Sequence, residues 1–280
     1  MRALIQDHER ARATSTVRPE LFSTRPDPVA LAPAWWATRR VWQRGRVDHV
    51  DHPRPGAART ADATTAGSAA AQGWHDPAQV DEYVGRVSRL PPRLAGEAVL
   101  VDLLPSGPRR VLDLGCGDGR LAALVLDARP SVAEVVGLDS SPPMLDLARQ
   151  RFADDPRVDI QAGDLRDPIG RLGLFDLVVS GFAIHHLPDP RKRSLYGEVA
   201  AQLRPGGLFA NLEVVASATP ELHATFLTAI GKLADDPEDR LVDVETQLGW
   251  LRQSGLDQVD CLWRWRGFAL LVGMSGSTPA

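Results

Sequence analysis

The chain has 280 residues, of which 44% are hydrophobic, and a formal net charge of −4 at pH 7. This length and composition allow one large globular domain with an extension. The slightly acidic balance gives no reason to expect nucleic acid as a partner.

The sequence also gives an expectation for the cellular compartment. We find no apolar run of membrane-spanning length, and the first residues lack the apolar core of a signal peptide. The two cysteines, Cys116 and Cys261, lie far apart in no metal-ligand spacing. We therefore expect a cytoplasmic protein without disulfides or membrane contact, and we assign no metal ligand.

Residues 1–72 are rich in Pro, Arg, Ala and Thr and show no sustained periodicity, so we expect an N-terminal extension that is largely disordered or loosely packed. Within it, AWWATRRVWQRGR (34–46) has two interpretations. It is either a basic, aromatic segment that touches a membrane surface or RNA, or a short helix on the main domain without a fold of its own.

Regular patterns begin at Trp74. Helical spacing over 78–90 and 93–104, separated by Pro91 and Pro92, is followed by alternating strands and helices. The predicted strands are 111–114, 134–139, 157–164, 175–183 and 208–215, and the intervening helices are 119–129, 142–152 and 191–203. This alternation predicts a parallel sheet with helices on both faces.

The last part of the chain departs from this alternation. Two helices, 221–235 and 242–255, precede two strands, 258–265 and 267–273, whose short connection forces an antiparallel pair. We therefore predict an α/β fold over residues 73–275. It has a doubly wound, seven-stranded sheet, mostly parallel with a C-terminal antiparallel strand.

The stretch VLDLGCGDG (111–119) is the most informative for ligand binding. In doubly wound sheets the loop after the first strand lies at the ligand-binding edge, and glycines let backbone amides approach a ligand. The third glycine comes one residue too early for the dinucleotide fingerprint. Asp113 would also repel a pyrophosphate, whereas it suits the ammonium and sulfonium of S-adenosylmethionine.

The ends of the next two strands carry further candidate ligand contacts. Asp139 can accept hydrogen bonds from both ribose hydroxyls, a role that dinucleotide enzymes share. Asp164 is placed to accept from the adenine amine, with the Leu165 backbone beside it, and Met144 can lie against the adenine. These positions predict an adenosine ligand.

Together, VLDLGCGDG, GLDSSPPML, AGDL, FDLVVSGFAIHHLPD and LRPGGLF resemble the Rossmann-like (class I) S-adenosylmethionine-dependent methyltransferases, over residues 74–273. Within that superfamily, the chain looks most like small-molecule enzymes with a generic methyltransferase domain. The resemblance implies that Gly115, Gly117 and Gly119 cradle the methionine part. It also implies that Ser180 to Ala183 line the transfer face and that Tyr83 covers the ligand. The cofactor-binding residues predicted are Tyr83, Asp113, Gly115, Cys116, Gly117, Asp139, Ser140, Met144, Asp164, Leu165 and Ser180.

His185 and His186 follow the fourth strand, where a general base would stand if the acceptor is a hydroxyl or an acidic carbon. The alternative is that one of them only packs in the turn before Leu187 and Pro188. Cys116 is interpreted as a small side chain beside the ligand and not as a nucleophile.

A group of aromatic residues near the C-terminus also has two interpretations. It either packs under the terminal hairpin or forms a cage for a cation, and Arg264 and Arg266 are expected to face solvent. The aromatic residues are Trp250, Trp263, Trp265 and Phe268.

We therefore expect a methyltransferase that uses S-adenosylmethionine and acts on a small-molecule acceptor. A homodimer is compatible with the sequence. Three alternatives stay open: an enzyme of carboxy-S-adenosylmethionine or tRNA modification, a nicotinamide-dependent oxidoreductase, and a non-catalytic module that only binds the cofactor. Neither the acceptor nor the atom methylated follows from the sequence.

Overall fold

The computed structural model describes Trp74 and residues 76–276. The predicted extension over residues 1–72, with its tryptophan-rich segment, lies outside the described residues and stays a prediction. Within the described part, helices and strands alternate along the chain as the sequence indicates.

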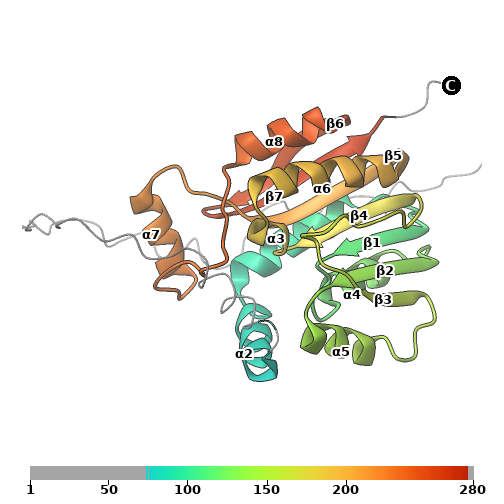
Figure 1. Ribbon diagram of the computed structural model, residues 1–280, viewed down its shortest axis with the longest axis horizontal. Coiled ribbons are helices and arrows are strands. Elements are labelled where there is room, and N and C mark those ends of the chain that lie inside the picture. Colours follow the sequence, from blue (N-terminus) through green and yellow to red (C-terminus); the bar gives the residue numbers. More distant parts are fainter. Residues whose placement is uncertain (1–73, 75, 277–280) are drawn as a thin grey trace, which may run out of the picture. The chain divides into compact units, whose positions relative to one another are not determined.

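The centre of the fold is a seven-stranded sheet with the order β3-β2-β1-β4-β5-β7-β6 (Figure 1). Strands β1 to β5 run parallel to one another, and β7 runs antiparallel to both β5 and β6. The predicted mixed sheet is therefore confirmed, and its order reverses beside β1, which is where ligands bind in such sheets. The strands are β1 (Arg110–Leu114), β2 (Glu134–Asp139), β3 (Val158–Ala162), β4 (Phe175–Gly181), β5 (Leu203–Val214), β6 (Leu256–Trp265) and β7 (Phe268–Ser275).

Helices cover both faces of this sheet. Apolar residues of α3 and α4 pack on one face, and those of α6 and α8 pack on the other. Several helices carry a local start signal: Asp76, Ser141, Thr219 and Asp243 each accept a backbone N–H at an N-cap. The helices are α2 (Pro77–Val87), α3 (Pro91–Leu103), α4 (Arg120–Ala128), α5 (Pro142–Arg151), α6 (Asp189–Gln202), α7 (Pro220–Ala229) and α8 (Val244–Gln253), with a 3-10 turn, η3 (Ile184–His186).

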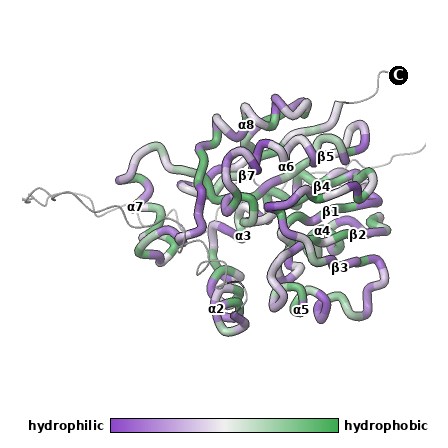
Figure 2. Tube along the Cα trace, viewed as in Figure 1, coloured by the Kyte–Doolittle hydropathy of each residue, from purple (hydrophilic) through white to green (hydrophobic). Residues whose placement is uncertain are grey.

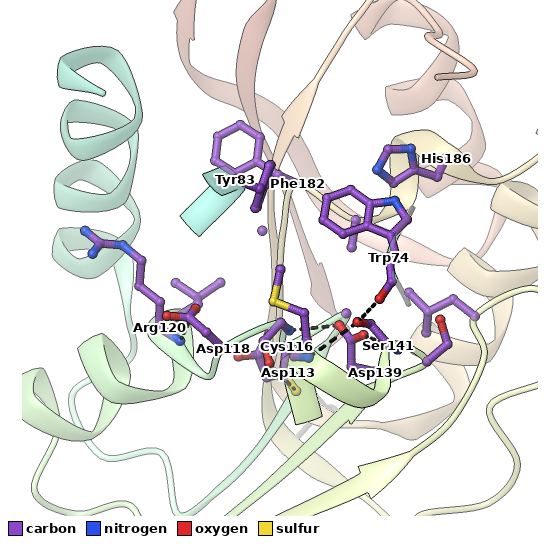
Figure 3. Close-up of a pocket in the computed structure, with 18 of the residues that line it drawn as sticks. Trp74, Tyr83, Asp113, Cys116, Asp118, Arg120, Asp139, Ser141, Phe182 and His186 are labelled. Atoms are coloured by element: carbon purple, nitrogen blue, oxygen red, sulfur yellow. Dashed lines mark hydrogen bonds between the residues drawn. The ribbon is translucent and has the colours of Figure 1, made fainter. Parts of the chain in front are cut away.

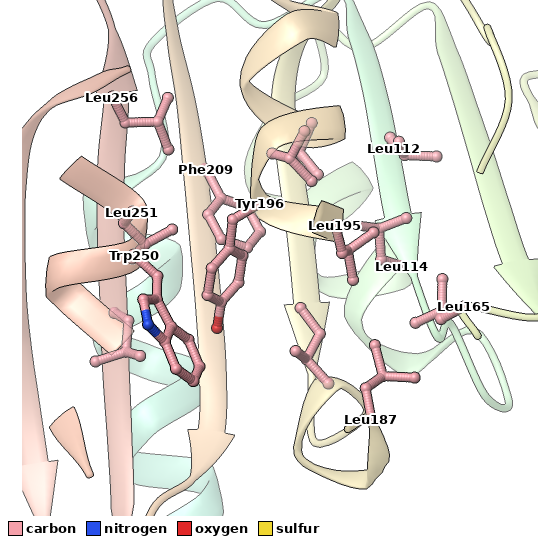
Figure 4. Packing of buried hydrophobic residues seen from close by; sticks show 14 of the residues in the cluster. Leu112, Leu114, Leu165, Leu187, Leu195, Tyr196, Phe209, Trp250, Leu251 and Leu256 are labelled. Atoms are coloured by element: carbon pink, nitrogen blue, oxygen red, sulfur yellow. The ribbon is translucent and has the colours of Figure 1, made fainter. Parts of the chain in front are cut away.

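The core on the α6 and α8 face is built from aliphatic side chains and large aromatic ones, of which Tyr196, Phe209 and Trp250 are labelled in Figure 4. Tyr196 of α6 and Phe209 of β5 are fully buried with ring centroids 5.9 Å apart, and Trp250 of α8 is 7% exposed. The Tyr196 hydroxyl donates to the amide oxygen of Gln247 at 2.7 Å, so its polar group is satisfied inside the core.

Hydropathy along the helices agrees with their position on the sheet. In Figure 2, α2 carries hydrophilic and hydrophobic residues side by side, and Val80 is its buried position. An amphipathic helix of this kind covers apolar surface with one side and faces water with the other. None of the helices described in residues 76–276 is long and apolar enough to cross a membrane.

Most boundaries differ from the sequence-based expectation by one to three residues, and two differ by more. RPGG, expected to close the helix before it, lies inside β5, which begins at Leu203 and pairs through that residue with Phe175 before a register shift. Helix α7 ends at Ala229, because Gly231 takes a positive φ of 73° just beyond it.

The aromatic residues at the C-terminal end are part of the core, which confirms the packing interpretation. Trp250 and Phe268 are buried, and the partly buried Trp263 and Trp265 pack against apolar clusters. Arg264 and Arg266 alternate with them along the chain and are exposed, as expected.

Candidate functional site

A cavity of about 510 Å³ lies where β1, β2 and β4 end, beside α2 and the loop before α8 (Figure 3). Its lining brings together residues from segments that are far apart in the sequence. Of the predicted cofactor-binding residues it contains Tyr83, Asp113, Gly115, Cys116, Gly117, Asp139, Ser140, Met144, Asp164 and Leu165. Their convergence on one cavity is compatible with the predicted role of these residues.

The glycine loop forms the floor of this cavity. Gly115 and Gly117 have φ angles of 65° and 53°, which L-residues rarely adopt. A Cβ on Gly115 would collide with the side chain of Ala183, whereas one on Gly117 would meet only the Met144 sulfur at 3.8 Å. Gly117 is thus the position where a side chain would fill the space that a ligand can use.

Gly119 has a different reason to be glycine. It caps α4 with a φ of 78°, and a Cβ there would lie 2.5 Å from the Phe152 ring. Gly119 is not among the lining residues of the cavity, so the structure does not place it with Gly115 and Gly117 at a ligand.

Asp113 is the most deeply buried carboxylate of the floor. It has no exposed surface, and its Oδ2 accepts from the Ala122 N–H at 3.1 Å, while its Oδ1 has no hydrogen-bond partner among the described residues. Burial, together with the charges of Asp139 and Asp118, raises the pKa of Asp113 to about 7. An unpaired buried carboxylate oxygen is costly, so this position favours a ligand that brings a cation or a donor.

Asp139 has a second role that the sequence did not indicate. Its Oδ2 accepts from the Gly117 N–H and its Oδ1 from the Ser141 N–H, both at 2.8 Å. Burial raises the pKa of Asp139 although these donors act against it. Each carboxylate oxygen can accept more than one hydrogen bond, so Asp139 can brace the glycine loop and still accept from a ligand.

The end of β3 supplies Asp164 and Leu165. Burial raises the pKa of the Asp164 carboxyl, but hydrogen bonds from Arg166 at 2.8–3.0 Å outweigh it, and the net shift is downward. Asp164 therefore remains an acceptor at neutral pH. The Leu165 carbonyl accepts from Arg191 at 2.6 Å, which holds this segment in place.

Two predicted contacts differ from the others. The structure does not bring Ser180 to the cavity: its side chain is fully buried and its hydroxyl donates to the Leu114 carbonyl at 2.8 Å, so it joins β4 to β1. Cys116 lines the cavity, but burial and the nearby Asp113 and Asp139 raise the pKa of its thiol far above the ordinary value. A raised thiol pKa disfavours the thiolate that a nucleophilic cysteine needs.

The opposite wall of the cavity is aromatic. The Trp74 ring lies edge-on to Tyr83, with ring centroids 4.9 Å apart. Its centroid lies 5.9 Å from that of the His186 ring. The Trp74 carbonyl accepts from the Ser141 hydroxyl at 2.5 Å, which ties this wall to the start of α5. Phe182 continues the wall in Figure 3. Phe182 belongs to the segment Ser180 to Ala183 that was expected on the transfer face, whereas Trp74 was missed as a lining residue, because an isolated aromatic residue carries no motif.

A buried ion cluster lies beside the glycine loop and was also missed. Glu97 of α3 is 5% exposed and bonds two guanidinium groups that line the cavity, Arg93 at 2.9 Å and Arg120 at 2.6 Å. Burial acts to raise the pKa of Glu97, but the two arginines lower it overall. One sequence feature points to this residue: Glu97 is a carboxylate in the middle of the apolar segment LAGEAVL (94–100).

The two candidate catalytic histidines lie in different surroundings. His186 lines the cavity, whereas His185 does not line it and is 6% exposed. Two carboxylates flank His185: Glu213 Oε1 lies 2.6 Å from its Nδ1, and Asp239 Oδ1 lies 3.4 Å from its Nε2. The roles of Glu213 and Asp239 were not foreseen, although a charged residue in the apolar strand LFANLEVV marks Glu213.

Burial acts to lower the pKa of both histidines, and the carboxylates decide the outcome. For His185, Glu213 and Asp239 outweigh burial and raise the pKa to about 9. For His186, burial and the positive charge of His185 lower the pKa. His186 is therefore the neutral imidazole of the pair and the one that faces the cavity.

Comparisons with known proteins agree with this geometry. Residues 111–207 match a family described as a methyltransferase domain. Over 140 residues the chain is 36% identical to an uncharacterized methyltransferase of Mycobacterium tuberculosis, a match that covers 48% of this chain and 66% of that relative, just under two thirds.

Solved structures show the same fold at low sequence identity. An O-methyltransferase family protein from Burkholderia thailandensis superposes with a TM-score of 0.60 and 23% identity, covering 76% of this chain and 63% of that one. Human N-acetylserotonin methyltransferase in complex with S-adenosylmethionine gives a TM-score of 0.58 and 18% identity, covering 78% and 61%.

Proposed function

The chain carries a class I S-adenosylmethionine-dependent methyltransferase domain, and on this premise we propose that the protein methylates a small-molecule acceptor with this cofactor. The observation that carries the proposal is the floor of the cavity. There, a buried carboxylate oxygen of Asp113 without a partner lies beside a glycine loop with room for a ligand.

The residues present fit this cofactor in charge and in shape. Asp113, Asp118, Asp139 and Asp164 all line the cavity and favour a cationic ligand over a phosphate-bearing one. In our proposal Gly115, Gly117 and Asp113 hold the methionine part, Asp139 with Ser140 holds the ribose, and Met144, Asp164 and Leu165 hold the adenine. When bound, the cofactor supplies a methyl group on a sulfonium, whose departure leaves a neutral thioether.

The chain's own contribution is then to position the acceptor and to exclude water. Trp74, Tyr83 and Phe182 form an aromatic wall opposite the carboxylates, which suits a flat or apolar acceptor. We propose His186 as the catalytic side chain that contacts the acceptor. His185 is proposed as a positioning residue, because carboxylates flank both of its ring nitrogens.

A small molecule fits this arrangement better than a nucleic acid does. Arg93 and Arg120 are cavity-lining cations already bonded to Glu97, and the remaining carboxylates would repel a phosphate backbone. We propose the reducing cytoplasm as the location, because Cys116 and Cys261 are free thiols.

Methyl transfer can be tested before the acceptor is known. The full chain is incubated with methyl-labelled S-adenosylmethionine and a pool of small metabolites freed of protein and nucleic acid. We expect S-adenosylhomocysteine to form and the label to enter a small molecule. Tight cofactor binding without turnover would favour a module that only binds, and label that enters only added RNA would contradict the small-molecule acceptor. The mass of the ligand purified with the protein separates the cofactor from its carboxylated derivative.

A further inference from the structure

The histidine pair and Asp239 bring three metal-ligating atoms together at the acceptor end of the cavity. Asp239 lies in the loop between α7 and α8, far from η3 in sequence. Among the described residues, His185, His186 and Asp239 form a group whose ligand atoms all lie within 4.8 Å of one another. We propose that this group binds one divalent transition-metal ion and that Zn²⁺ is the preferred ion.

The distances fit a shared ion better than they fit direct hydrogen bonds. His185 Nε2 and His186 Nδ1 each lie 3.4 Å from Asp239 Oδ1, which is longer than an ordinary N–H···O bond. A Zn²⁺ bonded to each atom at about 2.0–2.2 Å would hold neighbouring ligand atoms roughly 3–3.5 Å apart. Two of the three separations already have this value.

Two of the three donor atoms also have no hydrogen bond within the part of the chain that the structure describes. These are His186 Nδ1 and Asp239 Oδ1, both buried, and the Asp239 side chain is 6% exposed. An unpaired buried polar atom costs about 1–3 kcal/mol, so an ion coordinated by both atoms would remove a cost that the fold otherwise carries.

The surrounding groups hold the ligands in the orientation that a metal requires. Glu213 Oε1 lies 2.6 Å from His185 Nδ1 and fixes that ring, which leaves Nε2 directed to Asp239. Glu213 is itself held by the backbone N–H groups of His185 and Val214. A carboxylate behind a ligating histidine is the usual outer support of a metal site.

Asp239 is oriented in the same way. Its second oxygen accepts from the Asp236 N–H at 3.1 Å, so Oδ1 remains directed toward the histidines. The Arg240 N–H donates to the His185 carbonyl at 2.9 Å, and the Lys192 ammonium donates to the Arg240 carbonyl. The loop that supplies Asp239 is therefore fastened both to η3 and to α6.

The proposed ion would keep a position open for a further ligand. All three residues line a second, smaller cavity of about 70 Å³, shared with Phe226 and Phe268, and His186 also lines the large one. Two imidazoles and one carboxylate with an open position are a ligand set of catalytic zinc and other first-row metals. Binding of the ion does not depend on the proposed methyl transfer. Only a role of the ion in binding an acceptor oxygen would rest on that proposed function.

The test uses metal binding and needs no acceptor. The full chain is stripped with a chelator and titrated with ZnCl₂ by calorimetry at pH 7.5, with CoCl₂ absorption as a second measurement. We expect one ion per chain, and at least a 100-fold loss of affinity in Asp239→Asn and in His186→Gln. His223→Gln is the matched control, because His223 pairs with Asp235 at 2.8 Å outside the group and should leave the affinity unchanged.

Cofactor binding is measured on the same samples. It reports whether each variant is folded, and it tests the proposed function separately from metal binding. The proposal is overturned if the wild-type chain binds no stoichiometric ion. In that case a protonated His185, held between Glu213 and Asp239, takes the place of the metal. It is equally overturned if folded Asp239→Asn and His186→Gln bind the ion as the wild type does. Should neither variant fold, anomalous diffraction at the zinc edge from wild-type crystals decides, and a peak elsewhere contradicts the site.

Discussion

Asp139 joins the glycine loop to the start of α5, because its two oxygens accept from Gly117 and Ser141. Any ribose contact that it makes is therefore added to a carboxylate that is already held in place. A side chain with two fixed oxygens loses little freedom when a ligand binds, which favours affinity.

We expect Asp139→Ala to weaken S-adenosylmethionine binding at least tenfold. Hydrogen bonds to a charged group contribute about 1.5–3 kcal/mol each, and about 1.4 kcal/mol corresponds to a factor of ten. Calorimetry with the purified chain measures this, and Asp159→Ala, an exposed carboxylate on β3, is the control. Unchanged affinity in Asp139→Ala would remove this residue from the site.

Asp113 makes the stability of the cofactor-free protein depend on pH. Its folded pKa of about 7 lies above the unfolded value of about 3.9. Its stabilising contribution is therefore fully present below about pH 4 and is lost as the pH rises through 7. Between pH 5 and pH 8 we expect the wild type to lose about 2–4 kcal/mol relative to Asp113→Asn. Denaturant unfolding at the two pH values measures this, and parallel curves for both proteins would contradict the buried, unpaired carboxylate.

A cationic ligand beside Asp113 should offset the free-energy cost of ionising this buried carboxyl. Because the ligand prefers the ionised carboxylate, the affinity for S-adenosylmethionine should rise from pH 6 to pH 7.5, by up to about tenfold per pH unit below the pKa. In Asp113→Asn the affinity should be lower and show no such rise. A wild-type affinity that falls over this range would show that Asp113 does not meet a positive charge.

At the scale of single residues, the sequence predicted the groups that belong to local motifs. Asp113 and Asp139 lie in the last two residues of β1 and β2, and Gly115 and Gly117 follow β1, so their convergence results from the topology of the sheet. Asp239 could not be predicted in this way. It reaches the histidines only because a loop between two helices is fastened to η3, and loop conformation depends on tertiary contacts.

At the scale of elements, hydrophobic runs predicted every strand of the sheet, and the boundaries are where the prediction differed. RPGG contains Pro and Gly, which favour turns, yet this segment continues β5 because Leu203 pairs with Phe175. Local residue preference gave way to pairing with a neighbouring strand, which a single sequence does not display.

Helix α3 approaches the sheet closely at Gly96. A Cβ there would lie 2.7 Å from Leu212 Cδ1 and 2.8 Å from the Trp263 ring. We expect Gly96→Ala to destabilise the protein by about 1–3 kcal/mol through overpacking. Gly197→Ala in α6 is the control, because nothing lies within 4 Å of its Cβ and alanine favours a helix by about 1 kcal/mol. Thermal unfolding compares the two, and equal stability of both variants would contradict this packing.

At the scale of the whole molecule, the residues from Trp74 onward supply the entire described cavity. Deleting residues 1–72 should therefore leave the affinity for S-adenosylmethionine unchanged. Deleting residues 1–89 removes Trp74 and Tyr83 with α2 and should weaken it. Calorimetry on both truncated proteins measures this difference. Loss of binding in the shorter deletion would mean that the extension contributes to the site.

All the proposed ligand contacts require that a positively charged nucleoside binds against the glycine loop after β1. A crystal structure of the full chain with S-adenosylmethionine would show this binding. We expect density for the ligand along Gly115 and Gly117, with its ammonium near Asp113 and its ribose hydroxyls on Asp139. Density for the ligand at another surface, or a loop closed by the protein's own side chains at saturating ligand, would contradict it.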